Sequence, residues 1–301
     1  MGSILVFGSN GFIGKNLTAS LQDHYPVSEI SLRNDDWRTK LGKSEVYINL
    51  IGKAHDHKGT AVESDYFHAN YELTKELFES FQQSDAKLFI HISSIAAVEE
   101  YESTNLLDEN AECNPVSFYG KSKRKAETYL LEQNLNLDKK IVILRPTMVH
   151  GPGDKGNLTL LFKLISKGIP YPLAKFDNKR SFLSIGNFNF CILKIIENRE
   201  TIHSGIYNVC DDEPVATSQI IEIIKRICNQ KVLNLYIPKK IIRMIAITGN
   251  YIPIPLNSKR LNKMTASLIV SNKKIGKELG IQKLPVTAAE GLETTLKSFL
   301  K

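Results

Sequence analysis

Tyr119 and Lys123, in the stretch YGKSK, form the pair of residues with the clearest chemical potential in this sequence. The surrounding stretch FYGKSKRKAETYLLEQN has a helical pattern, and a spacing of four places both side chains on one face of a helix. A tyrosine on its own is a poor base, because its pKa is about 10. A neighbouring ammonium group favours the phenolate and lowers that pKa, which lets Tyr119 exchange a proton with an alcohol.

A serine that can assist this chemistry lies 25 residues upstream of Tyr119. Ser94 is the last residue of KLFIHISS, an apolar stretch typical of a buried strand. A serine at a strand end can belong to a site at the carboxyl edge of a parallel sheet, although it can also simply cap a turn. We therefore predict Ser94, Tyr119 and Lys123 as the catalytic residues.

Three glycines follow the first apolar stretch, ILVF, and precede a helical segment. Glycine permits a tight turn and a close approach of the backbone to a ligand, and the start of a helix offers free N–H groups to a phosphate. The alternative is a turn that only needs small residues. We predict a pyrophosphate-binding turn here. Its expected cofactor contacts are Gly8, Asn10, Gly11, Phe12, Ile13 and Gly14.

The elements that must position these groups are strands and helices in alternation. Apolar stretches near 4–7, 29–33, 45–52, 87–94 and 140–146 are separated by helical patterns such as 14–24, 67–84 and 118–134. Strands that are apolar throughout indicate a parallel sheet covered on both faces, so the predicted fold class is α/β, doubly wound, of Rossmann type. We predict a dinucleotide-binding domain over 1–147, with a returning segment near 181–205, and a smaller, mostly helical substrate-binding domain mainly over 148–301.

The G-x-x-G-x-x-G spacing, together with Ser94, Tyr119 and Lys123, resembles the extended short-chain dehydrogenase/reductase superfamily and, within it, the NAD-dependent epimerase/dehydratase family. The resemblance extends over essentially the whole chain. It implies an enzyme that binds NAD(P) through the glycines, Tyr119, Lys123 and Gly52, and a nucleotide-sugar substrate, most often a UDP-sugar. Homodimers built from two helices per subunit, one carrying the tyrosine, are common in look-alikes.

Further positions match the superfamily one by one. Asn70 matches an asparagine that supports the active-site strands, and Lys53 or His55 would face the substrate from the loop that follows 45–52. Arg180 matches a position that often clamps a nucleotide diphosphate, which suits the bidentate arginine side chain. The residues expected to bind substrate are Lys53, Ser94, Asn157, Leu158 and Arg180.

The end of the second strand usually selects the dinucleotide, with an acid for NAD and an arginine for NADP. Arg33 occupies this place, which favours NADP as the cofactor. Asp35 and Asp36 follow closely, so NAD stays open.

Two features separate the reactions of this superfamily. Ser94 is followed by Ile95 and Ala96 rather than by the Asp-Glu pair of dehydratases, so dehydration is not expected. Met148 replaces the asparagine of the R-x-x-N-x-x-G pattern common in epimerases. We predict reduction of a UDP-4-keto-(6-deoxy)-HexNAc at C4 for surface polysaccharide synthesis. The alternatives are a nucleotide-sugar 4-epimerase with tightly bound NAD and a non-catalytic NADP-binding regulator.

Composition excludes several other classes. The 301 residues carry a formal charge of +7, but Lys and Arg are scattered along the chain, so nucleic acid is not an expected partner. Four cysteines without a C-x-x-C pair predict neither a metal site nor disulfides and suggest a reducing cytoplasm. The run His55-Asp56-His57 lacks further ligands, and we expect no metal there. No transmembrane segment is expected. The stretch PKKIIRMIAITGNYIPIP (238–255), both basic and apolar, predicts a packed helix, with contact to a membrane surface as the alternative.

Overall fold

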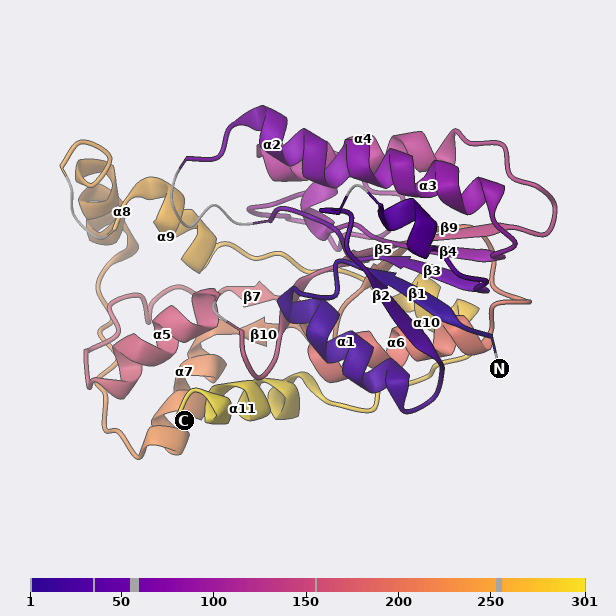
Figure 1. Ribbon diagram of the computed structural model, residues 1–301. Helices are drawn as coiled ribbons and strands as arrows, with labels where there is room; N and C mark the ends of the chain where they lie inside the picture. Colours follow the sequence, from indigo (N-terminus) through magenta and orange to yellow (C-terminus); the bar gives the residue numbers. More distant parts are fainter. Residues whose placement is uncertain (1, 35, 55–59, 155, 253–255, 301) are drawn as a thin grey trace.

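A computed structural model describes residues 2–34, 36–54, 60–154, 156–252 and 256–300 (Figure 1). Its centre is a parallel sheet in the order β2-β1-β3-β4-β5-β9, which confirms the predicted doubly wound α/β fold. The strand order reverses direction around β1, and open sheets of this kind bind ligands at the carboxyl edge next to that point. The six strands are β1 (Ile4–Phe7), β2 (Val27–Ile30), β3 (Val46–Asn49), β4 (Leu88–Ile92), β5 (Lys140–Pro146) and β9 (Gly205–Val209).

Helices cover both faces of the sheet (Figure 1). On one face α1 (Phe12–Gln22) packs against α6 (Ile185–Glu197), and on the other α3 (Leu73–Gln83) packs against α4 (Phe118–Leu131). Successive side chains of a strand point to opposite faces, so Val6 of β1 joins the core under α1 and α6, whereas Phe7 joins the core under α3 and α4. Burial on both faces explains why the inner strands β1, β3, β4 and β5 are mostly apolar, whereas the edge strand β2 exposes Ser28 and Glu29.

Two elements have different bounds in the structure from those expected from the sequence. β2 ends at Ile30 and not at Arg33, because the chain turns over 31–34 and then places Trp37 in the core from a 3₁₀ turn, η1 (Trp37–Lys40). The helix expected over 67–84 begins earlier, as α2 (Glu63–Phe67), and passes through a π-helical turn, η2 (His68–Glu72), before α3. Such π turns often occur at functional sites.

A second group of elements has its own core, made by the helices α5, α7, α8, α9 and α11. Two short two-stranded ladders pair β6 with β8 and β7 with β10, and the second of them lies between this group and the main sheet (Figure 1). The bounds are β6 (Met148–His150), α5 (Asn157–Ser166), β7 (Lys179–Arg180), β8 (Phe182–Ser184), β10 (Val215–Ala216), α7 (Thr217–Cys228), α8 (Lys239–Thr248), α9 (Ser258–Thr265), α10 (Lys273–Glu278) and α11 (Ala288–Ser298).

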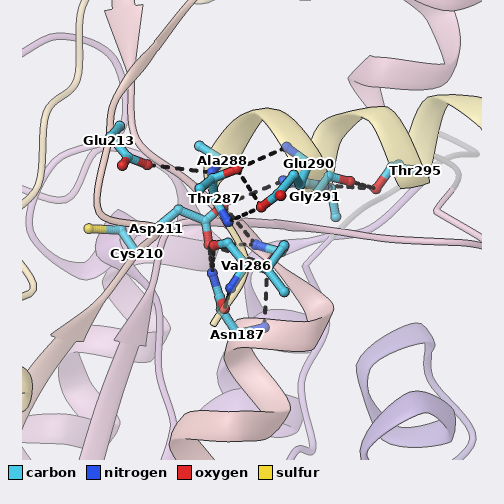
Figure 2. Close-up of polar contacts among 12 residues, drawn as sticks. Asn187, Cys210, Asp211, Glu213, Val286, Thr287, Ala288, Glu290, Gly291 and Thr295 are labelled. Carbon is cyan, nitrogen blue, oxygen red and sulfur yellow. Dashed lines mark hydrogen bonds and ion pairs between the residues drawn. The ribbon is translucent and has the colours of Figure 1, made fainter. Parts of the chain in front are cut away.

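A buried polar junction joins the main sheet to the C-terminal helix (Figure 2). Asp211, just after β9, accepts hydrogen bonds from the Ser184 N–H at the start of α6 (3.1 Å) and from Asn187 Nδ2 (2.7 Å). Asn187 also pairs with both backbone groups of Val286, two residues before α11 (2.7 and 3.1 Å). Burial raises the pKa of Asp211 to about 6. The junction therefore holds α6, the end of the sheet and α11 in one arrangement.

Candidate active site

Ser94 and Tyr119 meet just beyond the end of β4. Ser94 begins the short 3₁₀ turn η3 (Ile95–Ala97), and its side chain lies near enough to the phenol of Tyr119 to oppose a rise in the pKa of that phenol. The helix α4 can approach this turn closely because its first turn contains Gly120. A Cβ atom on Gly120 would lie 2.3 Å from the carbonyl oxygen of Ala96. The chain thus brings together the predicted serine and tyrosine by a close helix-to-turn contact.

Lys123 lies one helical turn beyond Tyr119, with only 3% of its surface exposed. Its Nζ donates to the carbonyl oxygens of Ile92 at the end of β4 (2.8 Å) and of Ile51 just after β3 (3.3 Å). An ammonium group has three N–H donors, and within the described residues the third has no partner. This arrangement fits a lysine that donates one hydrogen bond to a bound cofactor.

The pKa of Tyr119 differs from the sequence-based expectation. Burial raises it, the hydrogen bond with Ser94 opposes that rise, and the charge of Glu100 adds to it. The expected lowering by Lys123 is therefore not seen in the protein alone, where burial of the phenol is the largest effect. Burial also lowers the pKa of Lys123, to about 8, with Glu127 opposing.

The lowered pKa of Lys123 predicts a change of stability with pH. The folded chain loses this proton at about pH 8 and the unfolded chain near 10.5, so between these values the unfolded chain binds more protons and stability rises with pH. Relative to Lys123→Met, the wild type should gain about 1–2 kcal/mol between about pH 8 and about pH 9.5. Urea unfolding of both proteins at several pH values measures this difference. A difference that stays constant over that range would show that Lys123 keeps its ordinary pKa.

The glycine turn lies at the carboxyl end of β1. Gly8 has φ +86°, a left-handed conformation that favours glycine. A Cβ atom on Gly14 would lie 2.5 Å from the carbonyl oxygen of Gly8, so α1 is seated directly on the turn. The first turn of α1 contains no acidic residue, and no side chain among the described residues caps it, so its N–H groups suit an anion. Asn10 and Gly11 are exposed beside Phe12 and Ile13, which begin the helix.

Gly14 and Gly11 should respond differently to substitution by alanine, which adds a methyl group at each position. Gly14→Ala has no space for its Cβ and should lower the free energy of unfolding by about 1–3 kcal/mol. At Gly11 the nearest atom to an added Cβ is 3.7 Å away, and its φ of −73° suits alanine, so Gly11→Ala should cost less than about 1 kcal/mol. Gly11→Ala should instead weaken dinucleotide binding about tenfold or more, equivalent to about 1.4 kcal/mol. Thermal melts and dinucleotide titrations separate the two effects, and equal losses of stability would contradict this reading of the turn.

The loop after β3 is held by Asn70, from the π turn of η2. Asn70 Oδ1 accepts from the Lys53 N–H (2.8 Å), and Nδ2 donates to Ser122 Oγ on α4 (2.8 Å). A Cβ atom on Gly52 would lie 3.1 Å from Lys123 Nζ, so glycine keeps the backbone close to the lysine. The side chain of Lys53 forms an ion pair with Asp65 (3.1 Å). His55, Asp56 and His57 lie outside the described residues.

The remaining predicted substrate residues come from the second group of elements. Arg180, in β7, is buried enough to lower its pKa, and its Nη2 lies 3.5 Å from the carbonyl oxygen of Glu100. The carboxylate of Glu100 accepts from the N–H (2.8 Å) and Oγ (2.7 Å) of Ser117, which caps α4. Arg180 thus contacts Glu100, the residue whose carboxylate binds the N-cap of the helix that carries Tyr119. Asn157 is the first residue of α5, although its side chain lies outside the described part, and Leu158 is buried beside it.

Arg33 lies in the turn after β2, exposed, at the same edge of the sheet as the glycine turn. Its N–H donates to Ser31 Oγ (3.4 Å), and Asp35 is outside the described residues.

A buried charge network behind the site was missed from the sequence. Glu127 accepts two hydrogen bonds from Arg145, from Nε (2.8 Å) and Nη2 (2.7 Å), and a third from Ser93 Oγ (2.6 Å). Ser93 is thereby engaged away from Tyr119, which leaves Ser94 as the serine beside the phenol. The available signal was spacing, since Glu127 follows Tyr119 and Lys123 at the same helical interval of four.

A parallel dinucleotide-binding sheet whose carboxyl edge places a serine, a tyrosine and a lysine beside a glycine turn defines the short-chain dehydrogenase/reductase class. The chain belongs to the NAD dependent epimerase/dehydratase family, whose sequence profile matches residues 4–210. It is therefore an NAD(P)-dependent enzyme.

Relatives of known name match over nearly the whole chain. A UDP-glucose 4-epimerase from Vibrio cholerae is 29% identical, with 99% of this chain and 96% of that protein aligned. An N-acetyl-alpha-D-glucosaminyl-diphospho-ditrans,octacis-undecaprenol 4-epimerase from Escherichia coli O157:H7 is 23% identical, over 98% of this chain and 94% of that protein. The NAD complex of UDP-glucuronic acid 4-epimerase from Bacillus cereus has the same fold, with a TM-score of 0.76 at 20% identity over 99% of this chain and 98% of that one. RMD from Pseudomonas aeruginosa, solved in complex with NADPH, also has this fold, with a TM-score of 0.74 at 18% identity over 100% of this chain and 98% of that one.

Proposed function

We propose that this enzyme transfers a hydride at C4 of a UDP-sugar, and that its reaction is 4-epimerisation. The observation that carries the shared C4 chemistry is the placement of Ser94 beside the phenol of Tyr119, with Lys123 buried one helical turn away. The choice of epimerisation is supported by the relatives, whose names are those of sugar 4-epimerases. It replaces the reductase reading, drawn from the sequence alone, as the first candidate.

Each side chain of the site has its own role in the proposed reaction. Tyr119, partly accessible at the start of α4, takes the proton from the sugar hydroxyl and returns it when the sugar is reduced again. Ser94 Oγ lies beside the phenol and orients the same sugar oxygen by a hydrogen bond. The ammonium group of Lys123 stabilises the phenolate that forms when Tyr119 loses its proton.

The residues present fit a dinucleotide. The open N–H groups at the start of α1 and the close backbone approach at Gly8 and Gly14 suit a pyrophosphate, and the unpartnered N–H of Lys123 suits a ribose hydroxyl. The bound nicotinamide supplies the hydride acceptor and, when oxidised, a positive charge that favours the phenolate. Gly52 keeps the backbone close to Lys123 and leaves that side of the lysine open.

The second candidate is a 4-ketoreductase that uses NADPH and a UDP-4-keto-6-deoxy-HexNAc. Two residues favour it: Arg33, exposed beyond β2 where a 2′-phosphate needs a cation, and Met148, in β6 in place of the epimerase asparagine. A non-catalytic regulator would not require Tyr119, Ser94 and Lys123 together at the carboxyl edge of the sheet.

The identity and retention of the cofactor test these candidates. The purified protein is denatured, and any released dinucleotide is identified and quantified. NAD retained through purification, with interconversion of UDP-GlcNAc and UDP-GalNAc or of UDP-glucose and UDP-galactose without added cofactor, is the expected result. Stoichiometric consumption of NADPH by the 4-keto sugar, with no epimer formed, would instead establish the reductase.

A sugar diphosphate attached to a polyprenol is a second substrate class for the same C4 chemistry. The name of the E. coli relative specifies such a substrate. The observation that favours it in this chain is the set of exposed apolar residues on α8, including Ile241, Met244 and Ile245. Parallel assays with UDP-GlcNAc and with a short-chain polyprenyl-diphosphate GlcNAc compare the two classes by kcat/KM.

A further inference from the structure

Exposed apolar side chains are concentrated in one short part of the chain. Half of the large apolar residues that are exposed in the described structure lie within 233–264, which is about a tenth of the sequence. The helix expected over 238–255 to be packed is therefore packed on one side only. The exposed residues are Leu233, Leu235, Tyr236, Ile241, Met244, Ile245, Ile247, Tyr251, Ile252 and Met264.

The helix α8 carries the centre of this surface. Ile242 and Ala246, four residues apart, are its buried residues and face the core of the second group of elements. On the opposite side Ile241, Met244 and Ile245 follow the i, i+3, i+4 spacing and form one apolar ridge, with exposed fractions of 48%, 68% and 41%. Figure 1 shows α8 at the extreme end of the molecule, beside α9 and away from the six-stranded sheet.

The charged side chains of this part of the chain are all positive. Residues 231–264 contain seven Lys or Arg residues and no Asp or Glu, so this segment carries +7, equal to the formal charge of the whole chain. Lys239, Lys240 and Arg243 are exposed in the first half of α8. Cations near the start of a helix oppose its dipole, so helix stability does not explain their placement. An anionic partner does explain it.

We propose that α8 and its flanking residues dock on the surface of an anionic phospholipid bilayer. The apolar ridge enters the boundary between headgroups and acyl chains, while Lys240 and Arg243 contact lipid phosphates. In the described part of the chain, every helix is too short or too polar to cross a bilayer, so the contact is with the surface. A second copy of this chain is a poor occupant, because two segments of charge +7 would repel one another across the contact.

Vesicle sedimentation tests this proposal without reference to catalysis. The full-length protein is mixed with vesicles of phosphatidylcholine alone or of phosphatidylcholine with about a third phosphatidylglycerol. The expected result is strong binding to the anionic vesicles, weak binding to the neutral ones, and a decline with salt, since each Lys or Arg near the surface is worth about fivefold in partitioning.

Two variants with matched controls identify the surface. Lys240→Glu with Arg243→Glu should weaken binding to anionic vesicles at least about 20-fold. Lys273→Glu with Lys277→Glu, exposed residues of α10, changes the net charge equally and should leave binding within about threefold. Met244→Asp should also weaken binding, whereas Leu137→Asp, an exposed apolar residue of the loop before β5, should not. Thermal melts show whether each variant is folded.

Several outcomes would overturn the proposal. Equal or absent binding of the wild type to both kinds of vesicle would do so, as would α8 variants that sediment like their folded controls. Loss of a dimer in Met244→Asp by analytical ultracentrifugation, with unchanged vesicle binding, would assign the ridge to self-association. If an α8 variant melts early, the salt dependence of wild-type binding still decides between an electrostatic bilayer contact and none.

Discussion

Tyr119→Phe will lower kcat for the C4 reaction by about 10³-fold, within the range expected for the loss of a positioned general acid and base. The phenol of Tyr119 lies beside Ser94, and the buried Lys123 follows one helical turn later. Phenylalanine keeps the ring and its packing but has no proton to exchange. KM for the sugar and the retention of the dinucleotide should therefore change only a few-fold. Steady-state kinetics on UDP-GlcNAc or UDP-glucose, with quantification of bound cofactor, measures both effects.

Tyr129→Phe is the matched control for this substitution. Tyr129 lies on the same helix, half-buried, but its ring packs against Tyr71 and Phe78 rather than at the site. Loss of the Tyr129 hydroxyl should leave kcat within about twofold of the wild-type value, because Tyr129 exchanges no proton in the reaction. If Tyr119→Phe retained wild-type turnover, Tyr119 could not be the acid and base, and the catalytic assignment would be wrong.

Arg145→Met will lower the free energy of unfolding by about 3–5 kcal/mol, because it leaves the buried carboxylate of Glu127 without its main partner. Arg145 and Glu127 are almost completely buried and are joined by two hydrogen bonds of 2.8 and 2.7 Å. Removing one member of a buried ion pair costs more than the pair contributes, since the remaining charge has lost its solvation and its partner. Urea unfolding of the variant and of the wild type measures the change.

Arg124→Met is the control within the same network. Arg124 Nη1 lies 3.1 Å from the same carboxylate, but its side chain is 36% exposed, so its removal should cost less than about 1 kcal/mol. Arg145→Met combined with Glu127→Met should recover much of the stability, because apolar side chains replace the whole pair. Equal costs for Arg124→Met and Arg145→Met would show that Glu127 does not depend on the buried arginine.

Several parts of the site followed from local spacing. An interval of four residues places Tyr119 and Lys123 on one helix face in any fold, and apolar runs that alternate with helical patterns specify a doubly wound sheet. The carboxyl ends of parallel strands lie at one edge, so the glycine turn after β1 and Ser94 after β4 had to share that edge. The order of residues along the chain was sufficient for these predictions.

Other features depended on contacts between distant segments. The ion pair of Lys53 with Asp65, the hydrogen bonds of Asn70 to the loop after β3, and the contact of Arg180 with Glu100 join residues whose spacing carries no regular period. The rise in the pKa of Tyr119 also required the structure, because it arises from burial by the surrounding chain. A sequence pattern indicates which face of its own helix or strand a side chain occupies. It does not indicate which other part of the chain packs against that face.

The helix α8 illustrates the same division. Its amphipathic pattern was evident in the sequence of residues 238–255, and so was its positive charge. That pattern could not show whether the second apolar ridge, at Ile241, Met244 and Ile245, would be covered by another part of the chain. Only the tertiary structure shows that ridge exposed, because coverage depends on where the rest of the chain packs. The sequence by itself thus determined the fold class and the order and spacing of Ser94, Tyr119 and Lys123, and the packing decided the environment of these residues and the surfaces left open.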